Sequence, residues 1–147
     1  MNLQIREATQ DDLPRVLEVY RKAGLDTDGS LTAREASEIM KSMHAYPNYK
    51  LFVSEEDSQI VGTFALLIMD NLAHKGAKSG VVEDVAVLPS LQGKGIGKRM
   101  MRFALNRCKD YGCYKMMLSS NESRTAAHKF YESLGFTRHG FSFRVAL

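Results

Sequence analysis

The chain has few cysteines, no long apolar run and no large excess of charge of one sign. Its two cysteines, Cys108 and Cys113, have no His or Cys neighbours at metal-ligand spacing, so we expect reduced packing thiols and no metal site. The apolar run from Ile60 to Met69 is too short to span a bilayer, and we expect no membrane partner. The formal net charge is only +3, which does not favour nucleic acid as a partner.

The length and composition are typical of one globular domain. A chain of 147 residues is long enough to form a single core, and we expect one domain over residues 1–147. The content of 44% hydrophobic and 25% charged residues is ordinary for a soluble protein. The first residues have neither a basic segment nor an apolar signal segment, which predicts a cytoplasmic location.

Hydrophobic periodicity and capping signals predict strands and helices along the whole chain. The expected strands are 2–8, 49–54, 59–70, 81–88, 114–119 and 136–145. The expected helices are 9–22, 32–44, 95–111 and 124–134. The polar loop 26–30 between the first two helices is interpreted in two ways, as the lining of an amine pocket or as a solvated turn. Strand 81–88, helix 95–111 and strand 114–119 form a βαβ unit, so these two strands should be parallel.

The stretch from Val82 to Met101 combines a strand, a turn at Pro89, a glycine-rich loop and the start of a basic helix. The loop glycines are Gly93, Gly95 and Gly97, and basic residues stand among and after them at Lys94, Lys98 and Arg99. Residues without Cβ let successive backbone N–H groups turn toward one point at the positive end of a helix. The stretch therefore predicts a phosphate site.

The spacing of this loop excludes two common phosphate motifs. The dinucleotide fingerprint needs a glycine where Lys98 stands, and a P-loop needs a glycine at Gln92 and a Ser or Thr at Arg99. The pattern Gln92-x-x-Gly95-x-Gly97 instead resembles the acetyl-CoA pyrophosphate loop of the GCN5-related N-acetyltransferases (GNAT). A glycine-rich turn that only lets strand and helix pack closely is the alternative.

A second motif lies further along the chain and is also similar to that family. It has the form Ala127-x-x-Phe130-Tyr131-x-x-x-Gly135-Phe136. The two motifs extend the resemblance over roughly the C-terminal half of the chain. The resemblance implies fold class α/β (α+β), the GNAT acyl-CoA N-acyltransferase fold. That fold has a mixed, mostly antiparallel central sheet of six to seven strands, flanked by about four helices, with a splayed gap between its two parallel strands.

The resemblance also implies acetyl-CoA (coenzyme A) as cofactor and a set of binding residues. The residues expected to bind it are Val85, Ala86, Val87, Gln92, Gly93, Lys94, Gly95, Ile96, Gly97, Lys98, Asn121 and Arg124. Family members often have an asparagine where this chain has Arg124, and Asn121 stands three residues earlier. Arg124 is interpreted as a contact of the cofactor phosphates or the substrate, or as an exposed residue of the first helical turn.

The expected catalytic residues are Tyr131 and Glu83. Acetyl transfer to an amine requires a neutral amine, a donor to the oxyanion and an acid for the leaving thiolate. A phenol with a pKa of about 10 can be that acid, as the resemblance implies for Tyr131, and the alternative is a packing role. Glu83 is expected to be the base, with a structural ion pair as the alternative. On a regular strand Glu83 and Asp84 point to opposite faces, unless the strand bends. The backbone N–H groups of Val85 to Val87 are the expected oxyanion donors.

These features predict an acetyl-CoA-dependent N-acetyltransferase. Neither motif contains a cysteine, so we expect direct transfer to a primary amine of a small molecule, such as an aminosugar, polyamine or amino-acid-like compound. Protein or peptide acetylation and a non-catalytic acyl-CoA-binding regulatory module are the alternatives. The segments 82–87 and 113–115 are similar to the glucosamine-6-phosphate N-acetyltransferase branch, but Ser119 stands where that branch has an acidic residue, which argues against assuming that substrate. The resemblance also makes a homodimer plausible.

Overall fold

The computed structural model describes residues 2–147 and consists of two compact units. The first unit ends at Met117 and the second runs from Leu118 to Leu147. The first contains all five strands and most helices, and the second contains one helix and the C-terminal segment. One domain over the whole chain stays a prediction.

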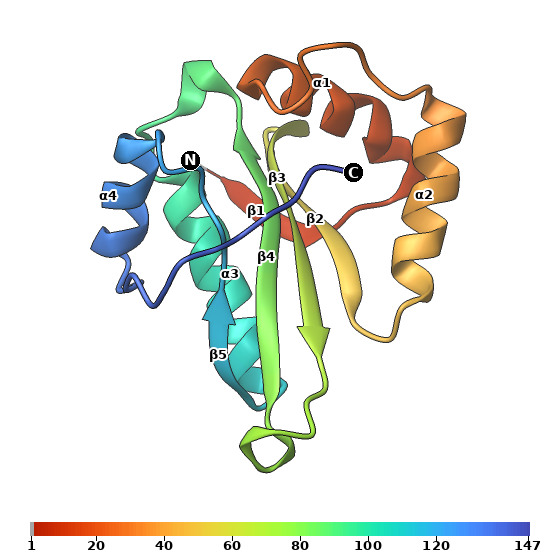
Figure 1. Ribbon diagram of the computed structural model, residues 1–147. Coiled ribbons are helices and arrows are strands. Elements are labelled where there is room, and N and C mark those ends of the chain that lie inside the picture. Colours follow the sequence, from red (N-terminus) through yellow and green to blue (C-terminus); the bar gives the residue numbers. More distant parts are fainter. Residues whose placement is uncertain (1) are drawn as a thin grey trace. The chain divides into compact units, whose positions relative to one another are not determined.

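A five-stranded sheet forms the centre of the first unit (Figure 1). Its strands are β1 (Leu3–Glu7), β2 (Tyr49–Glu56), β3 (Gln59–Met69), β4 (Lys78–Val87) and β5 (Cys113–Met117). They lie in the order β1-β2-β3-β4-β5, so every strand pairs with its sequence neighbour. The pairs from β1 to β4 are antiparallel, and β4 pairs with β5 in parallel. The mixed, mostly antiparallel sheet and the βαβ unit are confirmed.

The helices of the first unit are α1 (Leu13–Ala23), α2 (Ala33–Ala45) and α3 (Ile96–Asp110). A capping box starts α2, because Thr32 Oγ1 accepts from Glu35 N at 3.2 Å and Glu35 Oε2 accepts from Thr32 N at 2.8 Å. Gly24 ends α1 in the left-handed conformation with φ of 82°. Short 3₁₀ turns, η1 (Gln10–Asp12), η2 (His74–Gly76) and η3 (Pro89–Leu91), join the main elements.

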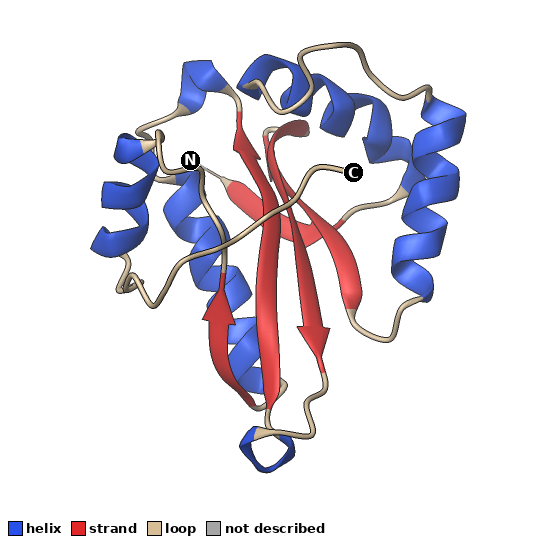
Figure 2. Ribbon diagram, viewed as in Figure 1, coloured by secondary structure: helices blue, strands red, loops and turns tan. Residues whose placement is uncertain are grey.

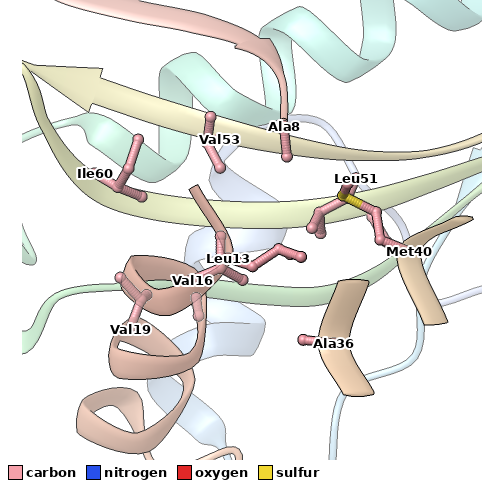
Figure 3. Packing of buried hydrophobic residues seen from close by; sticks show 11 residues of the cluster. Ala8, Leu13, Val16, Val19, Ala36, Met40, Leu51, Val53 and Ile60 are labelled. Carbon is pink, nitrogen blue, oxygen red and sulfur yellow. The ribbon is translucent and has the colours of Figure 1, made fainter. Parts of the chain in front are cut away.

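Both faces of the sheet are covered by helices. On one face the apolar stripes of α1 and α2 pack on β2 and β3, as Figure 3 shows for Val16, Met40, Leu51 and Val53. On the opposite face the ring of Phe103 in α3 contacts those of Phe52 and Phe64, with centroids 5.3 and 6.4 Å apart. Burying both faces makes this sheet the core of the unit.

An ion-pair network joins β1, η1 and β2. The guanidinium of Arg6 donates to both carboxylate oxygens of Asp12 at 2.7 and 2.9 Å and to Glu55 Oε2 at 2.6 Å. Asp12 also accepts from the backbone N–H of Thr9 at 2.7 Å. These bonds hold the pKa of Asp12 below its ordinary value, with the Arg6 hydrogen bond as the largest cause. The network fixes where the chain leaves β1 to enter α1.

The second unit contains α4 (Thr125–Ser133), followed by Gly135 with φ of 93°. The predicted strand 136–145 is wrong, since the chain beyond α4 forms no strand and Figure 2 shows it as loop. Phe141 and Phe143 are each 91% exposed. Alternating apolar residues make a strand only where the backbone finds a paired neighbour, and the structure gives this segment none within residues 2–147. The sheet therefore has five strands, not six to seven.

Within residues 2–147 the structure contains no helix of the length and apolar character that crossing a membrane requires.

Candidate active site

The glycine-rich loop turns directly into the start of α3. Gly93 and Gly95 have φ of 80° and 85°, in the left-handed region that favours glycine, and Gly95 is the N-cap of α3. Among residues 2–147, no backbone acceptor is found for the N–H groups of residues 93–98, and the first helical backbone bond runs from Arg99 N to Gly95 O at 3.1 Å. A run of free N–H groups at a helix start fits the pyrophosphate of a coenzyme A donor.

The basic residues around this loop have different surroundings. Lys94 and Lys98 are exposed, and their charges add to the positive potential of the loop. The guanidinium of Arg99 instead donates from Nη2 to the carbonyl oxygen of Leu3 at 2.8 Å. Gln92 Nε2 donates to Val87 O at 3.3 Å and so connects the loop to the end of β4. Arg99 thus joins α3 to β1, whereas the two lysines are available to an anion.

The last part of β4 has no partner on its β5 side. The parallel pairing runs only from Lys78 to Val81 on β4, and β4 continues to Val87. Within the described chain, residues 82–87 are paired with β3 alone. This agrees with the gap between the parallel strands that the resemblance implies. It leaves the outer backbone edge around Val85, Ala86 and Val87 available for hydrogen bonds to a bound acyl group.

β4 has a bulge beside this gap. Its register against β3 shifts by one residue, with the partner pairs Gly62–Val87, Thr63–Ala86 and Ala65–Glu83. Two residues, Asp84 and Val85, therefore lie opposite the single residue Phe64. Asp84 has φ of 52°, a left-handed conformation that is uncommon for a residue with a Cβ. Such bulges re-aim side chains and often lie next to functional sites.

The bulge breaks the strict alternation of faces between Glu83 and Asp84. Glu83 lies opposite Ala65, which belongs to the apolar cluster under α1 and α2. The charge of Asp84 acts on Tyr20 and Tyr49, whose rings pack against that cluster. The expectation of opposite faces applies to a regular strand, and β4 is irregular at this point.

Asp84 lies in an environment that disfavours its charge. Although the residue keeps contact with solvent, partial burial of the carboxyl group raises its pKa, and the nearby carboxylate of Asp26 raises it further. Burial also raises the pKa of Tyr20 well above its ordinary range, with the Asp84 charge as the next cause. A carboxylate with a raised pKa is a better proton acceptor and a common feature of catalytic sites.

The second unit holds the remaining predicted residues. Asn121 Oδ1 accepts from the backbone N–H and the hydroxyl of Ser123 at 2.9 and 2.7 Å, so its side chain shapes the turn before α4. Arg124 is exposed at the N-cap of α4. The ring of Tyr131 packs between those of Phe130 and Phe136 at 5.2 and 5.6 Å. Burial raises the pKa of Tyr131, and the charge of Arg124 opposes that rise.

The structure thus brings the predicted residues together in two groups, one in each unit. The first unit joins residues 92–98, the free edge of β4 and Glu83, and the second joins Asn121, Arg124 and Tyr131. Sequence reasoning missed that Tyr20 and Tyr49 lie within the electrostatic influence of Asp84. The Glu83-Asp84 pair was the available signal, but the irregular backbone at Asp84 is visible only in the structure. Within residues 2–147 no cluster of His, Cys, Asp or Glu is arranged to hold a metal ion.

Comparison with known proteins agrees with these features. A glucosamine 6-phosphate N-acetyltransferase of Trypanosoma brucei brucei is 36% identical over 98 residues, covering 67% of this chain and 65% of that protein. An aminoalkylphosphonate N-acetyltransferase of Salmonella typhimurium is 29% identical over 69% of this chain and 65% of its own length. The chain therefore spans just under two thirds of the length of these two relatives.

The fold similarity extends over nearly the whole chain. The crystal structure of glucosamine-6-phosphate N-acetyltransferase from Arabidopsis thaliana matches with a TM-score of 0.86 at 25% identity, covering 99% of both chains. The model of the Acetyltransferase (GNAT) family matches residues 7–136. The predicted family and its likeness to the glucosamine-6-phosphate branch are confirmed, and the chain belongs to the Acetyltransferase (GNAT) family.

Proposed function

We propose that the chain transfers the acetyl group of acetyl-CoA directly to the primary amine of a small molecule. The observation that supports this most strongly is the run of free N–H groups at residues 93–98, connected by Gln92 to the unpaired end of β4. Relatives named as N-acetyltransferases of glucosamine 6-phosphate and of aminoalkylphosphonate support an amine acceptor.

The chain offers binding groups for each part of the cofactor. The N–H groups of residues 93–98 and the charges of Lys94 and Lys98 would bind the pyrophosphate. The free edge of β4 at Val85 to Val87 would hold the acyl part and donate to its carbonyl oxygen. Arg124 is proposed as a further phosphate contact, and Asn121 as a residue that shapes the adjoining turn. When bound, acetyl-CoA supplies an activated acetyl thioester.

Three side chains would manage the protons of the reaction. The amine nitrogen forms a bond to the thioester carbon, the carbon–sulfur bond breaks, and the thiolate takes a proton. Tyr131 would supply that proton, because burial keeps its phenol protonated. The amine must lose a proton before or during attack, and Glu83 and Asp84 are the proposed acceptors. Partial burial raises the pKa of Asp84, which favours proton uptake by this carboxylate, so Asp84 is the acceptor to test first.

Two measurements test this proposal. Acetyl-CoA at a hundred times its Kd should stabilise the protein by about 2.7 kcal/mol and raise its Tm. Thiol release should then be seen with aminosugars, polyamines or amino acids. The absence of any Tm shift at saturating acetyl-CoA would refute the cofactor assignment. Thiol release with peptides alone would support protein acetylation, and cofactor binding without release would support the non-catalytic module. The cytoplasmic location and the homodimer stay predictions.

A further inference from the structure

A groove beside α2 has the size of a small-molecule site. Its volume is about 480 Å³, within the range typical of ligand pockets. Ile39 and Met43 of α2 and Tyr46 and Tyr49 after it form its apolar and aromatic wall. Ile39 is 46% exposed and Tyr46 is 56% exposed. Apolar side chains that line an open groove are suited to contact an alkyl chain.

The charged groups of this groove are all acidic. Glu35 and Glu38 line it, and its described lining contains no lysine or arginine. The backbone N–H and hydroxyl of Thr32 lower the pKa of Glu35, so this carboxylate is ionised at neutral pH. Arg34 lies 3.4 Å from Glu38, but the two side chains are 89% and 64% exposed, and such pairs are weak. The groove therefore favours a cation and disfavours a phosphate or phosphonate.

Two aromatic rings add a second preference for positive charge. The rings of Tyr46 and Tyr49 lie 5.6 Å apart at an interplanar angle of 47°. The faces of tyrosine rings attract ammonium groups. The two rings therefore add to the preference of the groove for positive charge.

Tyr49 connects this groove to the carboxylates of β4. Tyr49 lies opposite Leu67, and Leu67 lies opposite Val81. Side chains two residues apart on a strand share a face, so Glu83 stands next to this row. The charges of Asp84 and Glu83 also act on the Tyr49 hydroxyl, whose pKa is raised mainly by burial. One end of the groove therefore lies over the same face of the sheet as Glu83, two strands away from it.

We propose that the groove beside α2 binds the outer part of the acceptor, and that the acceptor is an alkyl amine carrying a second ammonium group. This inference rests on the proposed function. One amine reaches Glu83 and Asp84, the alkyl chain lies along Ile39 and Met43, and the second ammonium meets Glu35 and Glu38. The acceptor differs in charge from the phosphate- and phosphonate-bearing compounds for which the two relatives are named.

Thiol release with three acceptors tests this inference. Cadaverine has two ammonium groups, pentylamine has one on the same carbon chain, and glucosamine 6-phosphate carries an anion. The kcat/KM for cadaverine should exceed that for pentylamine by about tenfold, since two charge contacts of the size seen for exposed pairs give a factor of this order. Glucosamine 6-phosphate should be the poorest of the three.

A double variant identifies the groove as the source of this preference. Glu35→Gln with Glu38→Gln should raise the KM for cadaverine about tenfold while leaving pentylamine unchanged, and glutamine retains the capping box of α2. Glu56→Gln is the control, because it makes the same kind of substitution at one carboxylate, at the opposite end of β2 from Tyr49. It should leave all three acceptors unaffected.

The outcomes separate this inference from the proposed function. Faster release with glucosamine 6-phosphate or equal kcat/KM for cadaverine and pentylamine would overturn the inference and leave the acetyltransferase intact. If no acceptor gives thiol release, the proposed acetyltransferase function is refuted. Calorimetric titration with cadaverine then still tests whether the groove binds a diamine. Binding that weakens in the double variant supports the site, and absent or unchanged binding refutes it.

Discussion

Gly80 of β4 lies against the sulfur of Cys108 in α3, so closely that a Cβ on Gly80 would overlap Cys108 Sγ. Cys108 is 3% exposed, and burial is the main cause that raises its pKa to about 12, with neighbouring Cys113 adding to the rise. The thiol is therefore protonated and packed. This contact lets α3 approach the sheet near the start of the parallel pairing.

Gly80→Ala should destabilise the protein by about 1–3 kcal/mol, because an added methyl overpacks a closed contact. Urea unfolding of the variant and the wild type measures the difference. Gly140→Ala is the control, since a Cβ at Gly140 meets no heavy atom within 4 Å. Equal destabilisation by both variants would contradict the close approach of Gly80 to Cys108.

Gly95→Ala should weaken coenzyme A binding about tenfold, or about 1.4 kcal/mol, because the left-handed N-cap holds the free N–H groups together. Calorimetric titration measures the Kd. Gly112→Ala is the matched control: Gly112 has φ of 76° and open space around it, so it introduces the same backbone strain of about 1–2 kcal/mol away from the loop. A similar loss of affinity in both variants would show that general destabilisation is responsible, and not the arrangement of N–H groups in the glycine-rich loop.

Asp84→Asn should lower kcat/KM by at least about 100-fold if Asp84 accepts the amine proton, and should remove the acidic limb that this group gives to the pH–rate profile. Glu83→Gln is the parallel variant that tests the predicted base. A profile that changes with Glu83 and not with Asp84 would assign the role to Glu83.

The same change at Asp84 should raise stability at neutral pH. The folded-state pKa of Asp84 is raised, so its contribution to stability is fully present below the unfolded-state pKa of about 3.8 and is lost as pH rises toward the folded-state pKa. Asparagine carries no charge and tolerates the left-handed conformation. Thermal unfolding should therefore show a higher Tm for Asp84→Asn at neutral pH, with the difference shrinking in acid. A lower Tm at neutral pH would contradict the unfavourable environment.

Tyr131→Phe should reduce turnover about 100-fold with little change in the Kd for coenzyme A, because only the phenolic hydroxyl group is removed. Stopped-assay turnover and calorimetry measure the two effects. Tyr111→Phe, at an exposed tyrosine, should change neither. Unchanged turnover in Tyr131→Phe would remove it as the acid.

The sequence predicted the helix starts and the glycine loop well, because their signals are local. The capping box at Thr32 and Glu35 and the stop at Gly24 determine their helix ends whatever surrounds them. The bulge at Asp84 and Val85 was not predictable in the same way. Its residues fit a regular strand, and the shift arises from pairing with β3.

The prediction of a strand over residues 136–145 was wrong because, within residues 2–147, the pairing that a strand requires is missing there. The apolar alternation of this segment is a strong strand signal, but propensity does not supply a partner for the backbone. The surroundings of Asp26 could not be predicted either, because a polar loop residue carries no local signal for its neighbours. Its charge acts on Asp84 only because of the path that the loop after α1 takes. In both places long-range contacts, not local pattern, determine the surroundings of the residues.

The bond from Arg99 to the carbonyl of Leu3 has a practical consequence for handling the protein. Shortening the chain from its amino end, or fusing a tag that disturbs β1, would release this guanidinium beside the phosphate loop. A truncated protein would then offer an anion at this loop one positive charge that the intact protein uses elsewhere. Affinities measured on such a variant would report an altered loop, so β1 should be left intact in any engineered form.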